Sequence, residues 1–278
     1  MASDGALSPS GFVQQAVRAP GEALEDPGRV ATRRVIGVLG GMGPLATVDL
    51  YRKIIEVTPA SRDQEHLHVI IDADPSVPDR TEALLHGGPD PTPWLIAGAR
   101  RLAAAGASFI VIPCHTAHAF LPRLQAEAPV PVLSMVDETA DRLAQLLPVG
   151  ATVGLLATAG TVVSGLYHRA LGERGMRVVT PLEHEQADVS AAIAAVKAGQ
   201  LQRPTTEFVL GPALELVRRG AEALVAACTE LPLVLRQEEI PVPLIDPTRV
   251  LAEAAVALAL GRRPLPTPSP ELATRDAR

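Results

Sequence analysis

The sequence contains few of the residues that proteins use for disulfide bonds and aromatic packing. Among its 278 residues there are only two cysteines, and phenylalanine, tyrosine and tryptophan together make up 3%. Hydrophobic residues nevertheless reach 47% of the chain, which is enough for a buried core. That core must be built from Ala, Val, Leu and Ile, a composition typical of α/β proteins with Val/Ile-rich strands and Ala/Leu-rich helices.

An excess of positive charge and long apolar runs are also absent from the sequence. The formal net charge of −6 and the isoelectric point near 5.7 argue against a nucleic-acid partner, because domains that bind phosphate backbones are usually basic. No apolar run approaches the roughly 18 residues that a membrane helix requires. Because the sequence shows no secretory signal, we expect a cytoplasmic protein that does not bind membranes. The two cysteines could form a disulfide, but a reducing cytoplasm favours free thiols.

The two ends of the chain differ in composition from its middle. Residues 1–33 carry Ala, Gly, Pro and charges of both signs without a sustained period, and we expect a disordered extension there. Residues 262–278 include four prolines within seven positions. This tail is predicted to be too rich in proline to pack.

The middle of the chain alternates between strand and helix patterns. An apolar run at 34–39 is followed by the glycine turn 40–43 and a helical pattern at 45–57. A second strand is predicted at 66–72, an Ala-rich helix at 93–105, and a third strand that ends at Cys114. Strands and helices that alternate at this length predict a mostly parallel sheet flanked by helices.

The second half of the chain repeats the plan of the first. Gly37 and Gly154 begin similar segments, Gly106–Ala107 and Gly220–Ala221 precede the two cysteines by the same eight positions, and Pro129–Leu133 is echoed by Pro241–Ile245. The order of these matches predicts two pseudo-symmetric α/β domains. We place the first at 34–140 with 246–261 and the second at 141–245, with the final helix at about 248–260 crossing back to cover the first.

Cys114 and Cys228 occupy matching positions in the two predicted domains. Each follows an apolar run and precedes a helical or proline-broken segment, so each is expected at the carboxyl end of a parallel strand, where such sheets bind ligands. Two thiols that face each other across a cleft are able to remove a proton from one face of a carbon and deliver one to the other. This chemistry needs no metal and no organic cofactor. The alternative interpretation is that both cysteines are inert core residues.

Three segments of the chain resemble the signatures of the cofactor-independent aspartate/glutamate racemases. They are Gly40–Thr47, Pro113–His118 and Cys228–Pro232. The version of the last motif that carries Glu230 resembles the aspartate-racemase-like branch of the family. The resemblance spans roughly residues 34–260. It implies two flavodoxin-like domains with the active site in the cleft between them, and an isomerase that racemises aspartate or glutamate without a cofactor. It also implies that Cys114 and Cys228 are the acid/base thiols. Homodimers are common among such folds, and we expect one here.

The resemblance further implies a set of substrate-binding residues. Arg80 would grip a carboxylate with its planar fork, and Lys197 would reach a second carboxylate. His115 stands where the family usually has asparagine. The resemblance therefore defines the type of reaction better than the identity of the substrate. His118 is either a residue that orients Cys114 or a structural histidine. The remaining expected substrate-binding residues are Gly41, Met42, Thr47, Thr116, Thr229 and Glu230.

Other functions fit the sequence less well. The glycine turn after the first strand imitates a dinucleotide-binding site, but the order of its glycines differs and Pro44 removes an N–H donor. A metal site made of Cys114, His115 and His118 lacks the spacing of a structural zinc centre. Two alternatives stay open. One is a related isomerase or decarboxylase that acts on another small carboxylic acid, and the other is a non-catalytic protein that binds small acids.

Overall fold

The computed structural model describes residues 33–266, apart from the side chains of residues 203 and 204. The predicted extension therefore lies outside the described residues except for Arg33, and the predicted tail lies outside them from residue 267 onwards. Two of the five described residues of that tail, Arg263 and Leu265, contact the fold, and residues 262–264 are exposed. Both Nη atoms of Arg263 donate to the carboxylate of Glu138, at 2.7 and 2.8 Å, and Leu265 contacts the hydrophobic core.

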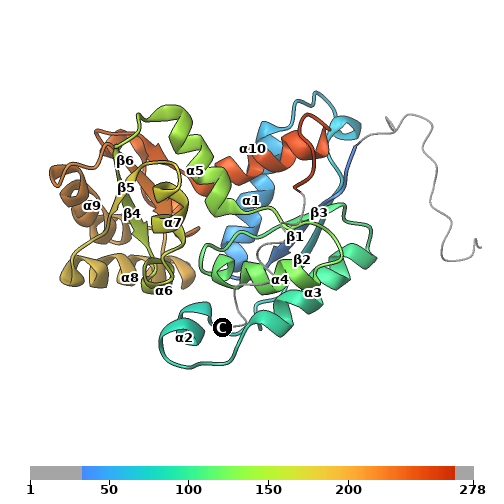
Figure 1. Cartoon of the computed structure of the whole chain (residues 1–278), viewed down its shortest axis with the longest axis horizontal. Helices are drawn as coiled ribbons and strands as arrows, with labels where there is room; N and C mark the ends of the chain where they lie inside the picture. The colour runs from blue at the N-terminus through green and yellow to red at the C-terminus, as the bar shows by residue number, and fades with distance from the viewer. Residues whose placement is uncertain (1–32, 267–278) are drawn as a thin grey trace, which may run out of the picture. The chain divides into compact units, whose positions relative to one another are not determined.

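The first sheet contains three parallel strands in the order β2-β1-β3 (Figure 1). An isolated parallel bridge between Ile110 and Val132 adds a fourth position beside β3. The strands are β1 (Ile36–Gly40), β2 (Val69–Ala73) and β3 (Phe109–Val111). The helical segments of this part are α1 (Pro44–Val57), η1 (Asp63–Glu65), α2 (Arg80–Leu85), α3 (Thr92–Ala104), η2 (Thr116–Phe120) and α4 (Leu121–Glu127).

The second sheet contains four parallel strands in the order β5-β4-β6-β7. Its strands are β4 (Thr152–Ala157), β5 (Arg177–Val179), β6 (Ala223–Ala227) and β7 (Leu244–Ile245). The helical segments around it are α5 (Met135–Leu146), α6 (Ala159–Val163), α7 (Leu166–Gly172), α8 (Glu183–Lys197), α9 (Arg203–Arg218), η3 (Leu231–Leu233) and η4 (Gln237–Glu239).

The two sheets confirm the repeat seen in the sequence. In both of them the first strand of the repeat lies between the second and the third. The echo of Pro129–Leu133 in Pro241–Ile245 is also confirmed, because Val132 and β7 take the same fourth position in their sheets. The predicted α/β class with two mostly parallel sheets is therefore correct. The contacts do not divide the described residues into two units at the predicted boundaries, so the exact domain limits stay a prediction.

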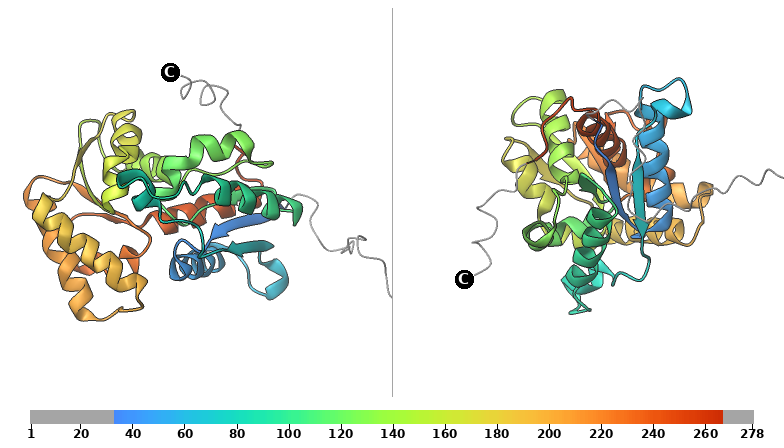
Figure 2. Two further views of the ribbon diagram at one scale, coloured as in Figure 1. Left: turned by 90° about the horizontal axis from the view of Figure 1, so that it is seen from below. Right: turned by 90° about the vertical axis from the view of Figure 1, so that its right-hand side faces the viewer.

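Apolar clusters cover both faces of each sheet. On the first sheet, residues of α1 and α10 (Pro247–Ala259) pack on one face and residues of α3 and α4 on the other (Figure 2). The predicted return of the last helix to the first part of the fold is thus confirmed. A buried ion pair joins α10 to α1, since Lys53 lies 2.5 Å from both Asp49 and Asp246.

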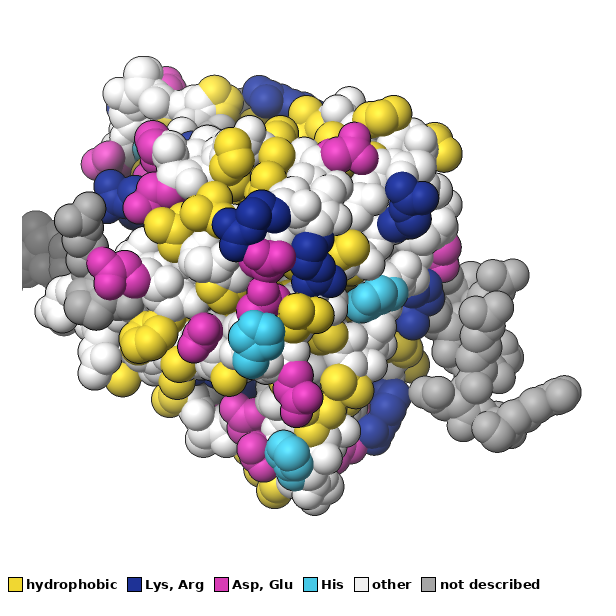
Figure 3. All heavy atoms as spheres, turned by 90° about the vertical axis from the view of Figure 1, so that its left-hand side faces the viewer, with side chains coloured by type: hydrophobic (Ala, Val, Ile, Leu, Met, Phe, Trp, Pro, Cys, Tyr) yellow, Lys and Arg dark blue, Asp and Glu magenta, His cyan; other side chains and the backbone are white. Residues whose placement is uncertain are grey.

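On the face shown in Figure 3, positive and negative side chains are interspersed rather than gathered by sign. Within residues 33–266, no helix is both long enough and apolar enough to cross a bilayer. The expected cytoplasmic location stays a prediction.

Candidate active site

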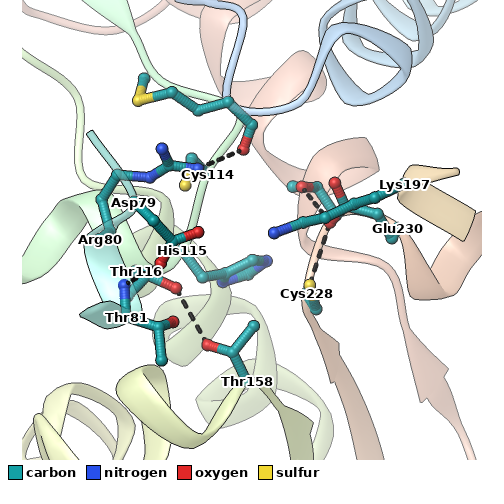
Figure 4. Close-up of a pocket in the computed structure, with 12 residues that line it drawn as sticks. Asp79, Arg80, Thr81, Cys114, His115, Thr116, Thr158, Lys197, Cys228 and Glu230 are labelled. Atoms are coloured by element: carbon teal, nitrogen blue, oxygen red, sulfur yellow. Dashed lines mark hydrogen bonds between the residues drawn. The ribbon is translucent and has the colours of Figure 1, made fainter. Parts of the chain in front are cut away.

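The two cysteines line one cavity between the sheets (Figure 4). Cys114 follows β3 and Cys228 follows β6 directly, and both are free and buried. Parallel strands place their carboxyl ends at one edge of the sheet, which explains why side chains distant in sequence meet here. The expected free thiols are therefore confirmed. The cavity is lined by Met42, Asp79, Arg80, Thr81, Cys114, His115, Thr116, Thr158, Lys197, Cys228, Thr229 and Glu230.

The turn after β1 has a conformation that only glycine tolerates well. Gly41 has a φ of 90°, and a Cβ at this position would collide with the main chain of Asp74. The hydroxyl of Thr47 accepts a hydrogen bond from the Gly41 N–H at 2.9 Å and donates one to the Gly43 carbonyl at 3.1 Å. The side chain of Thr47 thus holds the turn that presents Met42 to the cavity. Thr47 does not line the cavity, and its expected contact with substrate stays a prediction.

Cys228 is held as a protonated thiol. Its Sγ donates to Oε2 of Glu230 at 3.0 Å, and the Thr229 hydroxyl donates to the same oxygen at 3.2 Å. Burial raises the pKa of Cys228 well above its usual range, the Glu230 carboxylate raises it further, and the charge of Lys197 partly offsets both effects. A thiol in this state is a proton donor rather than a base.

Lys197 and Arg80 bring two positive charges to the cavity. Lys197 is the last residue of α8, and its side chain extends toward the middle of the cavity from the side of the second sheet (Figure 4). Arg80 is buried at the start of α2. Its Nη atoms donate to the carbonyls of Val77, Pro78 and Met42, while its buried Nε has no hydrogen-bond partner. Three of the five guanidinium N–H groups are thus engaged, and Nε–H and one Nη2–H remain for a ligand.

Asp79 is a cavity residue that the sequence interpretation missed. It caps α2, because its Oδ1 accepts from the N–H groups of Thr81 and Glu82 at 2.7 and 3.0 Å. Burial raises the pKa of Asp79, but the hydrogen bond from Glu82 N–H and the charges of Arg80 and Lys197 outweigh this effect and hold the pKa below its usual value. An ionised carboxylate at this position suits a substrate ammonium group. The signal was available, since Asp79 precedes Arg80 in the sequence.

Thr158 is a second missed residue, and it lies at the carboxyl end of β4. The Thr116 hydroxyl contacts Thr158 Oγ1 at 3.0 Å and Thr161 Oγ1 at 2.9 Å, so these threonines link the segment after β3 to α6 of the second sheet. The repeat could have identified Thr158, because the offset of 117 between Gly37 and Gly154 also relates Gly41 to Thr158.

The two histidines of the central motif have different surroundings. His118 accepts a hydrogen bond from the Met135 N–H at Nε2, at 3.0 Å, and its Nδ1 lies 2.9 Å from the Cys114 carbonyl. His118 therefore fixes the main chain at Cys114 and does not line the cavity. His115 does line the cavity, and its Nδ1 lies 3.0 Å from the Tyr167 hydroxyl. Burial lowers the pKa of His115 to about 3, with a smaller contribution from His118, so the ring is neutral at physiological pH.

A second cavity adjoins the first. The two share Met42, Asp79, Arg80, Lys197 and Glu230. The centre of a water molecule can reach about 450 Å³ of the second cavity. The corresponding volume of the first cavity is only about 20 Å³, which is enough for about one water. The walls that belong to the second cavity alone are mostly apolar: Gly41, Gly43, Pro44, Leu45, Pro75, Val77 and Val196.

The structure thus gathers most of the predicted site residues. Of the eleven residues expected in the site, all except Gly41 and Thr47 line the first cavity, and Gly41 lines the second. Among residues 33–266, no group of three or more His, Cys, Asp or Glu side chains is arranged to hold a metal ion.

Comparison with known proteins identifies similar sequences over most of the chain. A family model described as Asp/Glu/Hydantoin racemase matches residues 39–255. The broad specificity amino-acid racemase RacX of Bacillus subtilis (strain 168) is 30% identical over 230 residues, which cover 81% of this chain and 98% of RacX.

Solved structures show the same fold. The aspartate racemase of Picrophilus torridus is 31% identical with a TM-score of 0.71, and the match covers 86% of this chain and 98% of that one. An aspartate racemase homologue from Pyrococcus horikoshii OT3 is 26% identical with a TM-score of 0.66, over 81% of this chain and 99% of that one. The arrangement of the two sheets is therefore shared with these proteins.

Proposed function

Because the chain belongs to the Asp/Glu/hydantoin racemase family, we propose that it racemises an amino acid by moving the Cα proton between Cys114 and Cys228. One observation carries the proposal. The only two cysteines of the chain are free, buried, at the carboxyl ends of matching strands of two different sheets, and on the wall of one cavity.

The reaction needs one thiolate and one thiol. The thiolate sulfur takes the Cα proton, the C–H bond breaks, and its electron pair is delocalised into the substrate carboxylate. The opposite thiol then gives its proton to the other face of Cα and becomes the thiolate. Atoms and charge balance within the site, and no cofactor takes part. In this proposal Cys228, whose thiol donates to Glu230, takes the role of the proton donor, and Cys114 takes the role of the base.

The intermediate carries extra negative charge that the site must stabilise. The free N–H groups of Arg80 and the ammonium of Lys197 are the donors available for it. Donors fixed before the reaction are most effective where water is excluded. The main-chain carbonyls around Arg80 fix its guanidinium in this way.

Two carboxylates are the feature of the substrate that best matches these cations. Arg80 would bind one of them and Lys197 the other, which favours aspartate or glutamate. The relationship to the aspartate racemase of Picrophilus torridus supports this choice. The first cavity is too small for either amino acid, so we expect side chains or the two halves of the site to move apart when the substrate enters.

A neutral amino acid is the second candidate, and two observations favour it. Asp79 and Glu230 balance the charges of Arg80 and Lys197, so the wall of the cavity carries no net excess of positive charge when both carboxylates are ionised. The adjoining cavity also offers apolar walls to a larger side chain. The broad specificity named for RacX, a relative of this chain, agrees with such a substrate range.

Chiral analysis of an amino-acid panel tests the proposal. Each pure enantiomer is incubated with the full chain without added cofactor, and the formation of its mirror image is followed by chiral chromatography. We expect conversion of aspartate or glutamate, or of a neutral amino acid under the second candidate, and its loss in both Cys114→Ala and Cys228→Ala. Loss of a carboxyl group, or binding without conversion, would instead identify a related decarboxylase or a small-acid-binding protein. The expected homodimer stays a prediction that sedimentation would check.

A further inference from the structure

The hydroxyl of Tyr167 contacts the imidazole that lies next to the first cysteine in sequence. Tyr167 is a fully buried residue of α7, which packs on the second sheet. Its oxygen lies 3.0 Å from Nδ1 of His115, which follows β3 of the first sheet. The two rings are tilted by 38° with centroids 5.8 Å apart. This hydrogen bond therefore joins the two halves of the fold at the wall of the cavity.

The other ring nitrogen of His115 has no partner. Its Nε2 is buried and makes no hydrogen bond, and the whole residue is only 2% exposed. Figure 4 shows the imidazole extending toward the middle of the cavity, opposite the end of Lys197. A buried polar nitrogen without a partner is unfavourable, and here it lies in the wall of the cavity that would receive the substrate.

The position of the imidazole proton depends on the hydrogen bond at Nδ1, in which the donor is either the Tyr167 hydroxyl or Nδ1–H. The Tyr167 hydroxyl needs an acceptor because it is buried. Nδ1 of His115 is the partner to which the structure bonds it. Thr139 Oγ1 donates to the Met135 carbonyl at 2.7 Å but keeps its lone pairs, so it is the competing acceptor for the Tyr167 hydroxyl. A Tyr167 hydroxyl that donated to Thr139 would accept from Nδ1–H instead. When Tyr167 donates to Nδ1, the neutral ring carries its proton on Nε2.

We propose that Tyr167 is a positioning residue that holds His115 as the neutral Nε2–H tautomer, so that the cavity presents an uncharged hydrogen-bond donor to an oxygen atom of the substrate. The proposal rests on the proposed function for the identity of the ligand. Its ligand class is a carboxylate or amide oxygen that faces the segment after Cys114. The buried ring also remains neutral at physiological pH, so this contact adds directionality without adding a third positive charge to Arg80 and Lys197.

The tautomer is measured directly by 15N NMR of the full chain labelled at histidine. The chain has seven histidines, and the resonances of His115 are those lost in His115→Asn. We expect a protonated shift for Nε2 and an unprotonated shift for Nδ1. Tyr167→Phe, which removes only the hydroxyl, should change this assignment. Tyr51→Phe is the matched control, because Tyr51 is the counterpart of Tyr167 in the repeat and is exposed on α1.

Kinetics test whether the tautomer affects recognition. For the amino acid that is racemised, Tyr167→Phe should raise KM about fivefold, the worth of one neutral hydrogen bond, with a smaller effect on kcat. In the His115→Asn background the same substitution should have no further effect on KM, because Tyr167 acts through the imidazole. A general defect in folding would persist in that background.

The outcomes separate this inference from the proposed function. A proton on Nδ1, with Tyr167 donating to Thr139 instead, would overturn the inference whether or not the enzyme is active. An unchanged KM in Tyr167→Phe would also overturn it. The same holds if Tyr167→Phe raises KM by the same factor in the His115→Asn background as in the unaltered chain. Absence of racemisation with every amino acid would contradict the proposed function. The Nε2 resonance would then be followed during titration with L-aspartate alone, where a shift supports the inference and no shift contradicts it.

Discussion

The thiol of Cys228 donates a hydrogen bond to the carboxylate of Glu230, with Sγ and Oε2 3.0 Å apart. The two residues are separated by a single position, and both are buried. The carboxylate makes the thiolate of Cys228 unfavourable, so the pair keeps a proton ready for delivery to the substrate. The corresponding neighbour of Cys114 is Thr116, a neutral residue. The two thiols of the site are therefore electrostatically different although their positions in the two sheets are equivalent.

Replacing Glu230 by glutamine should lower the pKa of Cys228. Burial, the largest cause of the raised pKa, remains in the variant, but the charge of the carboxylate is removed. The thiolate should then form at lower pH. We expect alkylation of Cys228 by iodoacetamide at pH 8 to be severalfold faster, measured in the Cys114→Ala background.

The control for this experiment is Glu238→Gln, at an exposed carboxylate of η4. It should leave the rate of alkylation unchanged. An unaltered or slower reaction in Glu230→Gln would contradict the electrostatic role assigned to Glu230.

The protein should lose stability in mild acid because His115 is buried as a neutral ring. Its pKa is lowered from 6.5 to about 3 on folding, mainly by burial. The unfolded chain therefore binds a proton between these values while the folded chain does not, and stability falls as pH drops below about 6.5. His115 alone should cost about 2 kcal/mol at pH 5 relative to pH 7.5, and the lowered pKa of His118 adds a loss of the same sign.

Urea unfolding at pH 7.5 and pH 5 measures this loss. His115→Asn should lose less free energy of unfolding than the unaltered chain between the two conditions. His184→Asn, at an exposed histidine, should lose as much as the unaltered chain. Equal pH sensitivity in His115→Asn and in the unaltered chain would show that this histidine does not titrate as described.

Lys53 should be important for the attachment of α10 to α1. Its buried ammonium lies 2.5 Å from carboxylate oxygens of Asp49 and Asp246, and Asp246 also caps α10 by accepting from the N–H groups of Thr248 and Arg249. In Lys53→Met the two carboxylates would lose their shared cation. We expect a loss of about 3 kcal/mol in the free energy of unfolding.

Arg62→Met provides the contrast in the same unfolding measurement. Arg62 pairs with Glu65 at the surface, with 71% of its side chain exposed, and such pairs contribute at most about 1 kcal/mol. If Lys53→Met lowers the free energy of unfolding no more than Arg62→Met does, the buried ion pairs do not hold α10 on α1.

Much of the fold was predictable because its signals are local and repeated. The apolar runs before Cys114 and Cys228 are strands in the structure, and the order of the repeated segments matches the order of strands in the two sheets. A buried parallel strand needs a continuous run of apolar residues, so the pattern in the sequence is strong. The resemblance to the racemases, confirmed by the family match, identified nine residues that line the cavity.

The rest of the site depends on packing that a linear sequence does not contain. The contact of Tyr167 with His115 joins residues 52 positions apart through the relative placement of two sheets. Thr158 carries no motif of its own, because a threonine that caps a helix occurs in many proteins, and only the offset of the repeat points to it. The hydrogen bonds by which the Thr47 hydroxyl holds the turn at Gly41 were likewise not predictable from the motif, and the expected contact of Thr47 with substrate stays a prediction.

The most direct test of the two-thiol mechanism is the fate of the Cα hydrogen in D2O. A single enantiomer of the amino acid that the enzyme converts is incubated with the full chain, and proton NMR with chiral analysis follows both enantiomers at early times. Because the proton removed by one cysteine does not return through the other, the mechanism predicts deuterium at Cα of the newly formed enantiomer and almost none in the remaining substrate. Deuterium appearing equally in both enantiomers, or protium retained in the product, would indicate a single base and contradict the assignment of Cys114 and Cys228 as the two acid/base groups.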